Sequence, residues 1–217
     1  MVAFGRVVAV AAPDLDLGES VQRIVSVSGT SRPDNYTSHA LAVVNEELSA
    51  RGHPPDVIDA RQLALAFPGQ ESTDDAKELR SRVESCSGLV LATPEYHGSF
   101  SAMTKLIIEN LGFPSVLAGK PVALVGVAAG RIGAIKSLEQ LRGICAHVGA
   151  LVLPGSISIA GVRSAFDENG RCIDEKAEQA LRGVATSLLS FIENYVCPKF
   201  ALEELVRGEG RTWTSSI

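Results

Sequence analysis

A short segment rich in hydroxyl groups carries the densest set of chemically useful side chains in this sequence. It reads Ser-Gly-Thr-Ser-Arg-Pro-Asp-Asn-Tyr-Thr-Ser over residues 28–38. Thr30 and Ser31 can donate O–H hydrogen bonds, and the forked guanidinium of Arg32 can bind phosphate oxygens in pairs. Gly29 lets a ligand come close to the backbone. A helix is predicted to start here, and free N–H groups at a helix N-terminus favour a phosphate.

This segment has a simpler explanation as an ordinary turn between a strand and a helix. Ser, Thr, Asn and Pro are common in turns and helix caps. Pro33 disfavours an earlier helix start, and Asp34 or Asn35 can cap the helix that follows. Capping alone needs fewer hydroxyl groups and no arginine, which favours phosphate binding.

The pattern of glycines narrows the class of phosphate compound. A dinucleotide site would show GxGxxG followed about 20 positions later by an acidic residue. Here Gly29 stands alone and Asp59 comes later than that spacing, so Asp59 is better explained as a cap or an exposed strand end. A P-loop fails as well, because Pro121 follows the only Gly-Lys pair. A hydroxyl-rich loop without these patterns suits a terminal phosphate monoester, such as that of FMN.

A second segment, residues 93–101, offers flat side chains. It reads Thr-Pro-Glu-Tyr-His-Gly-Ser-Phe-Ser. Pro94 fixes one backbone angle and Gly98 permits a tight turn. Tyr96, His97 and Phe100 would form a wall for a planar ring in a mobile loop. The alternative places Tyr96 and Phe100 in the core as anchors and His97 on the surface. Two serines can cap the next helix, Ser99 and Ser101.

A third segment, residues 126–134, is rich in glycine and alanine. Its small residues would leave room for a ligand ring, and its N–H groups would face the polar edge of that ring. Arg131 would place positive charge near an anionic ring or a nucleotide phosphate. The alternative is a plain glycine-rich turn with Arg131 in solvent.

The elements around these segments alternate between two patterns. Short apolar runs rich in β-branched residues predict strands, and stripes of apolar residues at helical spacing predict helices between them. Strands that are apolar on both faces indicate a parallel sheet. We therefore expect an α/β fold, a three-layer α/β/α sandwich with a five-stranded parallel sheet. Ligands bind such sheets at the carboxyl ends of the strands, where all three segments fall. The predicted strands are 24–27, 57–58, 89–92, 122–127 and 151–153.

The domain boundaries and bulk composition limit the class of protein. We expect one domain over residues 22–195, an extension over 1–21 with a short strand at Val7–Val10, and a tail over 196–217. The net charge of −5 argues against a nucleic-acid partner. The chain shows no apolar run of the roughly 20 residues that a membrane span needs. Its four cysteines form no CxxC pair, which disfavours a metal site and suits reduced thiols in the cytoplasm.

Together, the three segments resemble the NADPH-dependent FMN reductase family of flavodoxin-like proteins, which includes azo, chromate and quinone reductases. The first loop of that family usually reads G-S-x-R-x-x-S-x-N. Residues 29–37 fit this pattern with three substitutions, Thr30 for Ser, Asn35 for Ser and Thr37 for Asn. Pro-Glu-Tyr-His-Gly-Ser at 94–99 is the most specific match, and Lys105 follows it. Gly-Lys-Pro at 119–121 and Gly-Arg-Ile-Gly at 130–133 also fit. The likeness covers about residues 22–195.

The resemblance implies FMN as cofactor and NADPH or NADH as co-substrate. The first loop would hold the FMN phosphate, the second would line the isoalloxazine largely through its backbone, and the third would close the other edge. A small acceptor such as a quinone, azo compound, chromate or flavin would take the electrons, and the protein would be a homodimer or homotetramer. Hydride transfer needs no protein acid or base, so we assign no catalytic residue and no metal ligand. The implied cofactor-binding residues are Ser28, Thr30, Arg32, Asn35, Tyr36, Thr37, Pro94, Glu95, Tyr96, His97, Gly130 and Arg131.

Two other classes of function share these features. A flavodoxin-type electron carrier has the same fold, but its phosphate loop usually lacks arginine and its surface is more acidic. A non-enzymatic scaffold of the same fold would require the three loops to be coincidence, and fold alone does not exclude it.

Overall fold

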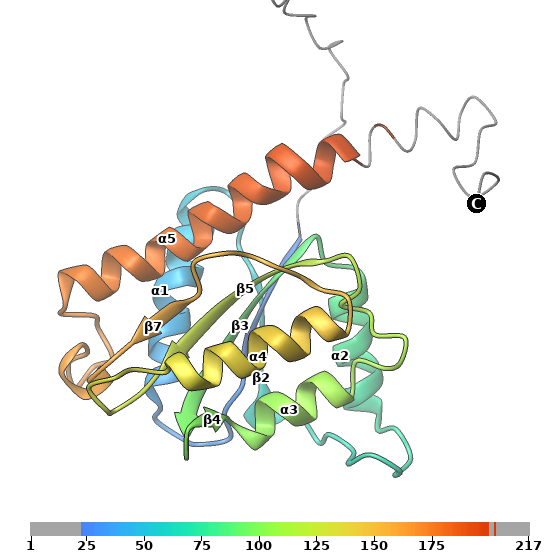
Figure 1. The fold of residues 1–217 in the computed structure, drawn as a ribbon, viewed down its shortest axis with the longest axis horizontal. Helices are drawn as coiled ribbons and strands as arrows, with labels where there is room; N and C mark the ends of the chain where they lie inside the picture. Colours follow the sequence, from blue (N-terminus) through green and yellow to red (C-terminus); the bar gives the residue numbers. More distant parts are fainter. Residues whose placement is uncertain (1–22, 200–201, 203–217) are drawn as a thin grey trace, which may run out of the picture.

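The computed structural model describes residues 23–199 and residue 202, and these residues build a parallel sheet with helices on both faces (Figure 1). The main strands are β1 (Ile24–Ser28), β2 (Asp56–Asp59), β3 (Gly88–Tyr96), β5 (Pro121–Val127), β6 (Leu151–Val152) and β7 (Ile157–Ile159). The helices are α1 (Tyr36–Ala50), α2 (Asp74–Glu84), α3 (Ala102–Glu109), α4 (Ile135–His147) and α5 (Glu175–Phe191).

The sheet has the strand order β2-β1-β3-β5-β6, with all neighbours on this path parallel. This order is that of the flavodoxin-like doubly wound folds, in which the order of strand addition reverses between β1 and β3. The predicted fold class is therefore confirmed. Short apolar runs form these strands because both faces of the sheet are covered; β1 and β5 are buried along their whole length.

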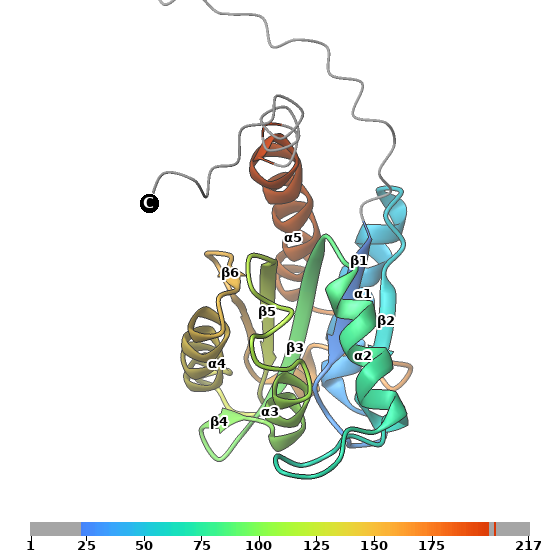
Figure 2. The same cartoon turned by 90° about the vertical axis from the view of Figure 1, so that its right-hand side faces the viewer.

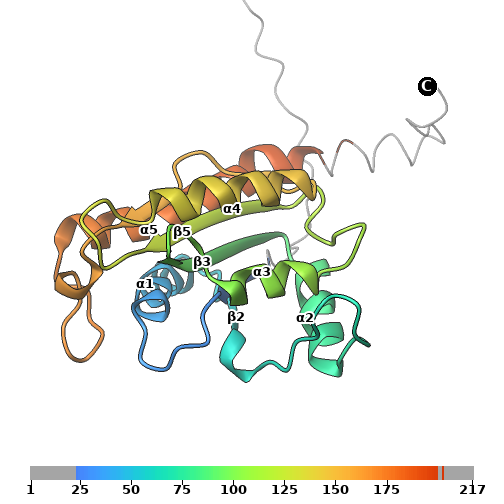
Figure 3. The same cartoon turned by 60° about the horizontal axis from the view of Figure 1, so that its bottom comes forward.

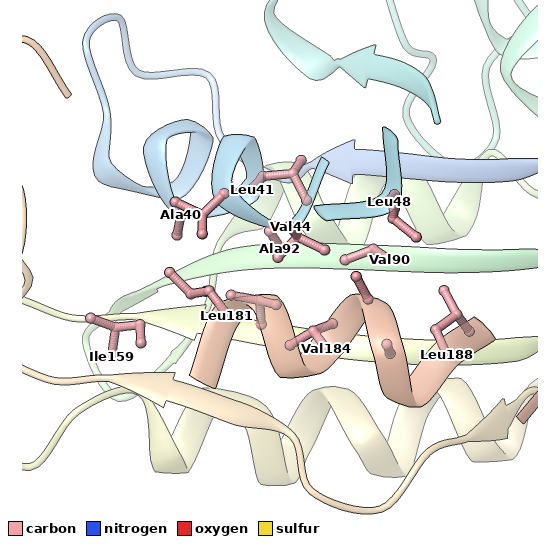
Figure 4. Close-up of a cluster of buried hydrophobic side chains, with 14 of the residues drawn as sticks. Ala40, Leu41, Val44, Leu48, Val90, Ala92, Ile159, Leu181, Val184 and Leu188 are labelled. Atoms are coloured by element: carbon pink, nitrogen blue, oxygen red, sulfur yellow. The ribbon is translucent and has the colours of Figure 1, made fainter. Parts of the chain in front are cut away.

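The helices cover the two faces unequally (Figure 2). Helices α1 and α5 pack on one face, where Leu41, Val44, Leu181 and Leu188 meet Val90 of β3 (Figure 4). Helices α2, α3 and α4 pack on the other face. The alternation along β3 sends Val90 to one core and Leu91 to the other, as a central strand requires.

The last strand of the sheet is interrupted. β6 pairs with the start of β5 and corresponds to the strand predicted at 151–153, whereas β7, which was not predicted, pairs with the end of β5. Arg142 of α4 bridges the gap, because its Nη2 donates to the carbonyl of Leu153 and to the hydroxyl of Ser156, both at 2.9 Å. Strand β7 ends beside the carboxyl end of β5 and so supports the third loop.

The predicted domain limits meet the structure only in part. Helical turns continue after α5 through Ile192–Val196 to residue 199, across the expected limit at 195. The extension over 1–21, with its expected strand at Val7–Val10, lies outside the described residues, as does most of the tail. In the described part, no helix is long and apolar enough to cross a membrane.

Candidate cofactor site

The three segments meet at one edge of the sheet, formed by the carboxyl ends of β1, β3 and β5 (Figure 3). We call residues 29–35 the first loop, residues 95–100 the hairpin and residues 128–134 the third loop. The first loop leads from β1 into α1, the hairpin leads from β3 toward α3, and the third loop leads from β5 into α4. Parallel strands bring these connections together although they are far apart in the sequence.

The first loop is folded around its own side chains. The Thr30 hydroxyl is buried and accepts a hydrogen bond from the Arg32 N–H at 3.2 Å. Asn35 caps α1: its Oδ1 accepts from the Ser38 N–H at 2.7 Å, and its Nδ2 donates to the Arg32 carbonyl at 2.9 Å. Asp34 has a φ of 44°, in the left-handed region. The loop therefore turns sharply into α1, whose first-turn N–H groups lack helical acceptors.

The predicted phosphate-binding residues of the first loop differ in their exposure and in the contacts that they already make. Arg32 is exposed and makes no ion pair with the part of the chain that the structure describes. Thr37 is buried in the first turn of α1, and the Ser28 hydroxyl lies 3.0 Å from the Ser38 hydroxyl. The ring of Tyr36 instead packs edge-on against His39 and tilted against Phe166. Arg32 and the helix N-terminus are thus the freest donors here.

The second segment is a β-hairpin rather than the mobile loop that its sequence suggested. β3 runs on to Tyr96 and pairs antiparallel with β4 (Ser99–Phe100). His97 and Gly98 form the two-residue turn, with φ angles of 51° and 75°, which the right-handed twist of a hairpin favours. His97 and Tyr96 are exposed, and Gly98 is partly buried. Pro94, in contrast, lies buried in the ladder with β5.

Contacts with α4 hold this hairpin in place. Glu95 Oε2 accepts from the Ser137 N–H at 3.1 Å and so caps α4, which has no side-chain cap at its own first residue. Gln140 accepts from the Ser99 hydroxyl at 2.8 Å and donates to the Gly98 carbonyl at 2.9 Å. Glu95 was predicted as a cofactor residue, and the structure commits its side chain to α4. Gln140 of α4 was not predicted, because no local pattern marks its contact with the hairpin.

The glycines in and just before the third loop serve two different purposes. A side chain on Gly126 would meet Ala134 at 2.7 Å, and one on Gly133 would meet the Ser158 hydroxyl at 2.4 Å, so these glycines serve packing. The space around Gly130 is open, as a ligand ring would require. Arg131 is exposed and, like Arg32, pairs with no carboxylate among the described residues.

An acidic group beside this edge is neutralised locally. Asp59, at the end of β2, caps a short 3₁₀ turn (Ala60–Gln62), as its sequence position suggested. The guanidinium of Arg61 hydrogen bonds both of its carboxylate oxygens and holds the pKa of Asp59 below its usual value. Arg32, Arg131 and the helix N-terminus stand at this edge against one exposed carboxylate of the first loop, Asp34, and this arrangement favours an anion.

These features define a class: a flavodoxin-like α/β protein with a donor-rich loop at the point where the strand order reverses. Comparison with known families makes the assignment specific. The model of the NADPH-dependent FMN reductase family matches residues 22–163, and the chain belongs to this family. It is accordingly an oxidoreductase whose cofactors are FMN and reduced nicotinamide.

Individual relatives agree with this assignment. The chain is 28% identical over 169 residues to a 2-hydroxy-1,4-benzoquinone reductase of a Burkholderia species, covering 74% of this chain and 90% of the relative. It is 28% identical over 176 residues to an NADPH azoreductase of a Bacillus species, covering 80% and 94%. The fold matches a flavoenzyme NAD(P)H:(acceptor) oxidoreductase from Paracoccus denitrificans with a TM-score of 0.67 and 23% identity, covering 81% of this chain and 99% of that chain.

Proposed function

We propose that this chain holds FMN with its phosphate on the first loop and its ring between the hairpin and the third loop, and passes electrons from NADPH or NADH to a small acceptor. The observation that supports this most directly is the start of α1, where first-turn N–H groups and an unpaired Arg32 meet at the switch point of the sheet. The acceptor class is that of the named relatives, a quinone or an azo compound.

The residues fit FMN by the chemistry of their donors. The first loop offers hydroxyls, N–H groups and a guanidinium, all of which bind a phosphate monoester, and its α1 helix has no acidic residue in its first turn to repel it. The open space at Gly130 and the exposed residue His97 in the turn of the hairpin suit a flat ring. Bound FMN would supply the two-electron chemistry between nicotinamide and acceptor.

The protein's part in this reaction is to bind and orient. Arg32 and the N-terminus of α1 would fix the phosphate, and Arg131 would place positive charge at the ring end. Glu95 and Gln140 would keep the hairpin at a set distance from α4. No side chain is assigned as an acid or base, because hydride transfer moves the proton and electron pair together.

The purified protein and its absorbance spectrum test the proposal. We expect the protein to be yellow as purified, or to be colourless and to bind added FMN. We expect NADPH or NADH to bleach the flavin band. A quinone or an azo dye should restore the band. A bound flavin that neither nucleotide bleaches would indicate an electron carrier. A protein that binds no FMN would exclude both flavin functions and leave a scaffold.

We further propose a cytoplasmic homo-oligomer, dimer or tetramer, with one domain over 22–195. Cys86, Cys145 and Cys172 are free thiols, as a reducing compartment would keep them, and burial raises the pKa of the Cys145 thiol to about 12. Exposed apolar side chains on the hairpin and around the third loop, Tyr96, Ile132 and Ile135, offer a surface for a second copy. Light scattering of the purified protein measures the oligomeric state, and a monomer would contradict this proposal.

A further inference from the structure

A cluster of three buried hydroxyl groups lies beneath the candidate site. Thr93 lies in the buried part of β3, Ser101 caps α3, and Thr104 lies in the first turn of that helix; none is more than 4% exposed. We call these three residues the hydroxyl clamp. Ser101 alone explains the helix cap, through its bond to the Thr104 N–H at 3.0 Å. The other two hydroxyls need another explanation.

The hydrogen bonds of the clamp form one consistent set. The Ser101 hydroxyl donates to the carbonyl of Gly29 in the first loop. Thr104 Oγ1 lies 3.0 Å from the same carbonyl and 2.9 Å from Thr93 Oγ1, and Thr93 donates to the carbonyl of Pro94 at 3.1 Å. Each hydroxyl has one proton to donate. Ser101 gives its proton to the Gly29 carbonyl and Thr93 gives its proton to the Pro94 carbonyl, whereas Thr104 Oγ1 has two acceptors within reach, the Gly29 carbonyl and Thr93 Oγ1. Thr104 therefore joins a carbonyl of the first loop to a hydroxyl at the base of the hairpin.

Gly29 is packed so tightly against β3 and α3 that no side chain would fit at this position. Its N–H donates to the carbonyl of Ala92 at 2.8 Å, so β3 holds it from the other side. A side chain at this position would stand 2.1 Å from Thr104 Oγ1. The first loop is thus held from below by α3 through Thr104 and Ser101, in a place that water does not reach.

We propose that Thr104 is a positioning residue for the cofactor: through the hydroxyl clamp it fixes the first loop relative to the hairpin, so that phosphate and ring are bound at one set spacing. This inference rests on the proposed function. It predicts a specific loss. Removing the Thr104 hydroxyl should weaken the part of the affinity that comes from the phosphate, because the loop that bears the phosphate donors loses a support while the ring walls keep theirs.

The experiment compares FMN with riboflavin, which lacks the phosphate, by quenching of flavin fluorescence. Thr104→Val keeps the shape and removes the hydroxyl. We expect the preference for FMN over riboflavin to fall about tenfold, which corresponds to one buried hydrogen bond. A general loss of packing would weaken both ligands alike and leave that preference unchanged. Thr186→Val is the matched control, since its hydroxyl bonds a helix carbonyl in α5 at 3.0 Å, far from the loops.

Two further measurements keep the test decisive. Should Thr104→Val not fold, the pair Thr104→Ser and Thr104→Ala isolates the hydroxyl, because both lack the methyl group; the serine variant should keep the preference for FMN and the alanine variant should lose it. An unchanged preference in a folded variant without the hydroxyl would overturn the inference. If the wild-type protein binds neither flavin, or shows no preference for FMN, the proposed function itself fails.

Discussion

The first loop and the hairpin face each other across the candidate site but are held in different ways. The first loop is supported from below by buried groups, Thr30 within it and the hydroxyl clamp beneath it. The hairpin is supported from the side, by the bond from Glu95 to the start of α4 and by Gln140 of α4, and these contacts are partly exposed. Buried hydrogen bonds cannot be replaced by water, whereas exposed ones can. In the proposed FMN complex, the phosphate end would therefore be set before the ligand arrives, and the ring end could adjust to successive reactants.

Both regions nevertheless use the same backbone device. Asp34 and His97 are the non-glycine residues with a left-handed φ in the described part of the chain, and each lies in one of the two regions. Asp and His adopt this conformation more readily than most residues, yet it still costs free energy. The left-handed φ of Asp34 and of His97 therefore indicates that contacts with the surrounding structure hold each turn in this conformation.

The largest expected effect comes from Gly29→Ala, which tests how rigid the first loop is. The new methyl group would lie 2.1 Å from Thr104 Oγ1 and 2.9 Å from the Ala92 carbonyl, and the backbone must move. We expect a loss of about 3 kcal/mol in the free energy of unfolding, at the upper end for overpacking. Urea unfolding measures it. A variant as stable as the wild type would show that the loop yields easily, and the contrast with the hairpin would disappear.

Replacing the two unpaired arginines compares the two ends of the site directly. Arg32→Ala should weaken FMN binding by about 1.5–3 kcal/mol, the range for a charge-assisted hydrogen bond. It should leave riboflavin binding nearly unchanged. Arg131→Ala should weaken both flavins by a similar, smaller amount, since its charge lies at the ring end. Fluorescence titration of both flavins is the measurement, and an unaltered FMN affinity in Arg32→Ala would place that side chain away from the phosphate.

On the hairpin side, Glu95→Ala should cost about 1 kcal/mol of stability, the usual effect of losing a helix N-cap. Glu95→Gln keeps an acceptor for the Ser137 N–H and should recover part of that loss, while the charge at the helix N-terminus is gone. Thermal unfolding of both variants provides the comparison. If the two variants were equally unstable, the charge alone would matter and the hydrogen bond would not.

The smallest expected effect concerns acid stability beside the first loop. Arg61 holds the pKa of Asp59 below its usual value, so the folded state favours the carboxylate. Its contribution is present at neutral pH, starts to fall near the unfolded pKa of about 4 and is gone below the folded pKa. We expect Asp59→Asn to cost about 0.5 kcal/mol at pH 7, because the pair is partly exposed, and this cost to shrink as the pH falls through the folded pKa of Asp59. Unfolding curves at several pH values measure this difference; a constant difference would contradict it.

Periodicity in the sequence predicted the sheet and its helices because long elements repeat their pattern several times. β4 and β7 escaped prediction, since two or three residues carry no period. Capping was predictable from local chemistry, and Asn35 and Ser101 were among the candidates. Glu95 was not, because its partner is 42 positions away. Gly126 shows a third limit: a small residue that serves helix packing looks the same in sequence as one that makes room for a ligand.

The interrupted last strand has a consequence for how this protein behaves at high concentration. An edge strand with a long free ladder invites the strand of another molecule. Here the edge offers only β6 and β7, two and three residues long, with Arg142 occupying the carbonyl of Leu153 between them. At the opposite edge, β2 is four residues long and carries Asp56, which is bonded to Arg82. Both margins of the sheet thus resist aggregation by strand addition, and association between copies is left to helices and loops.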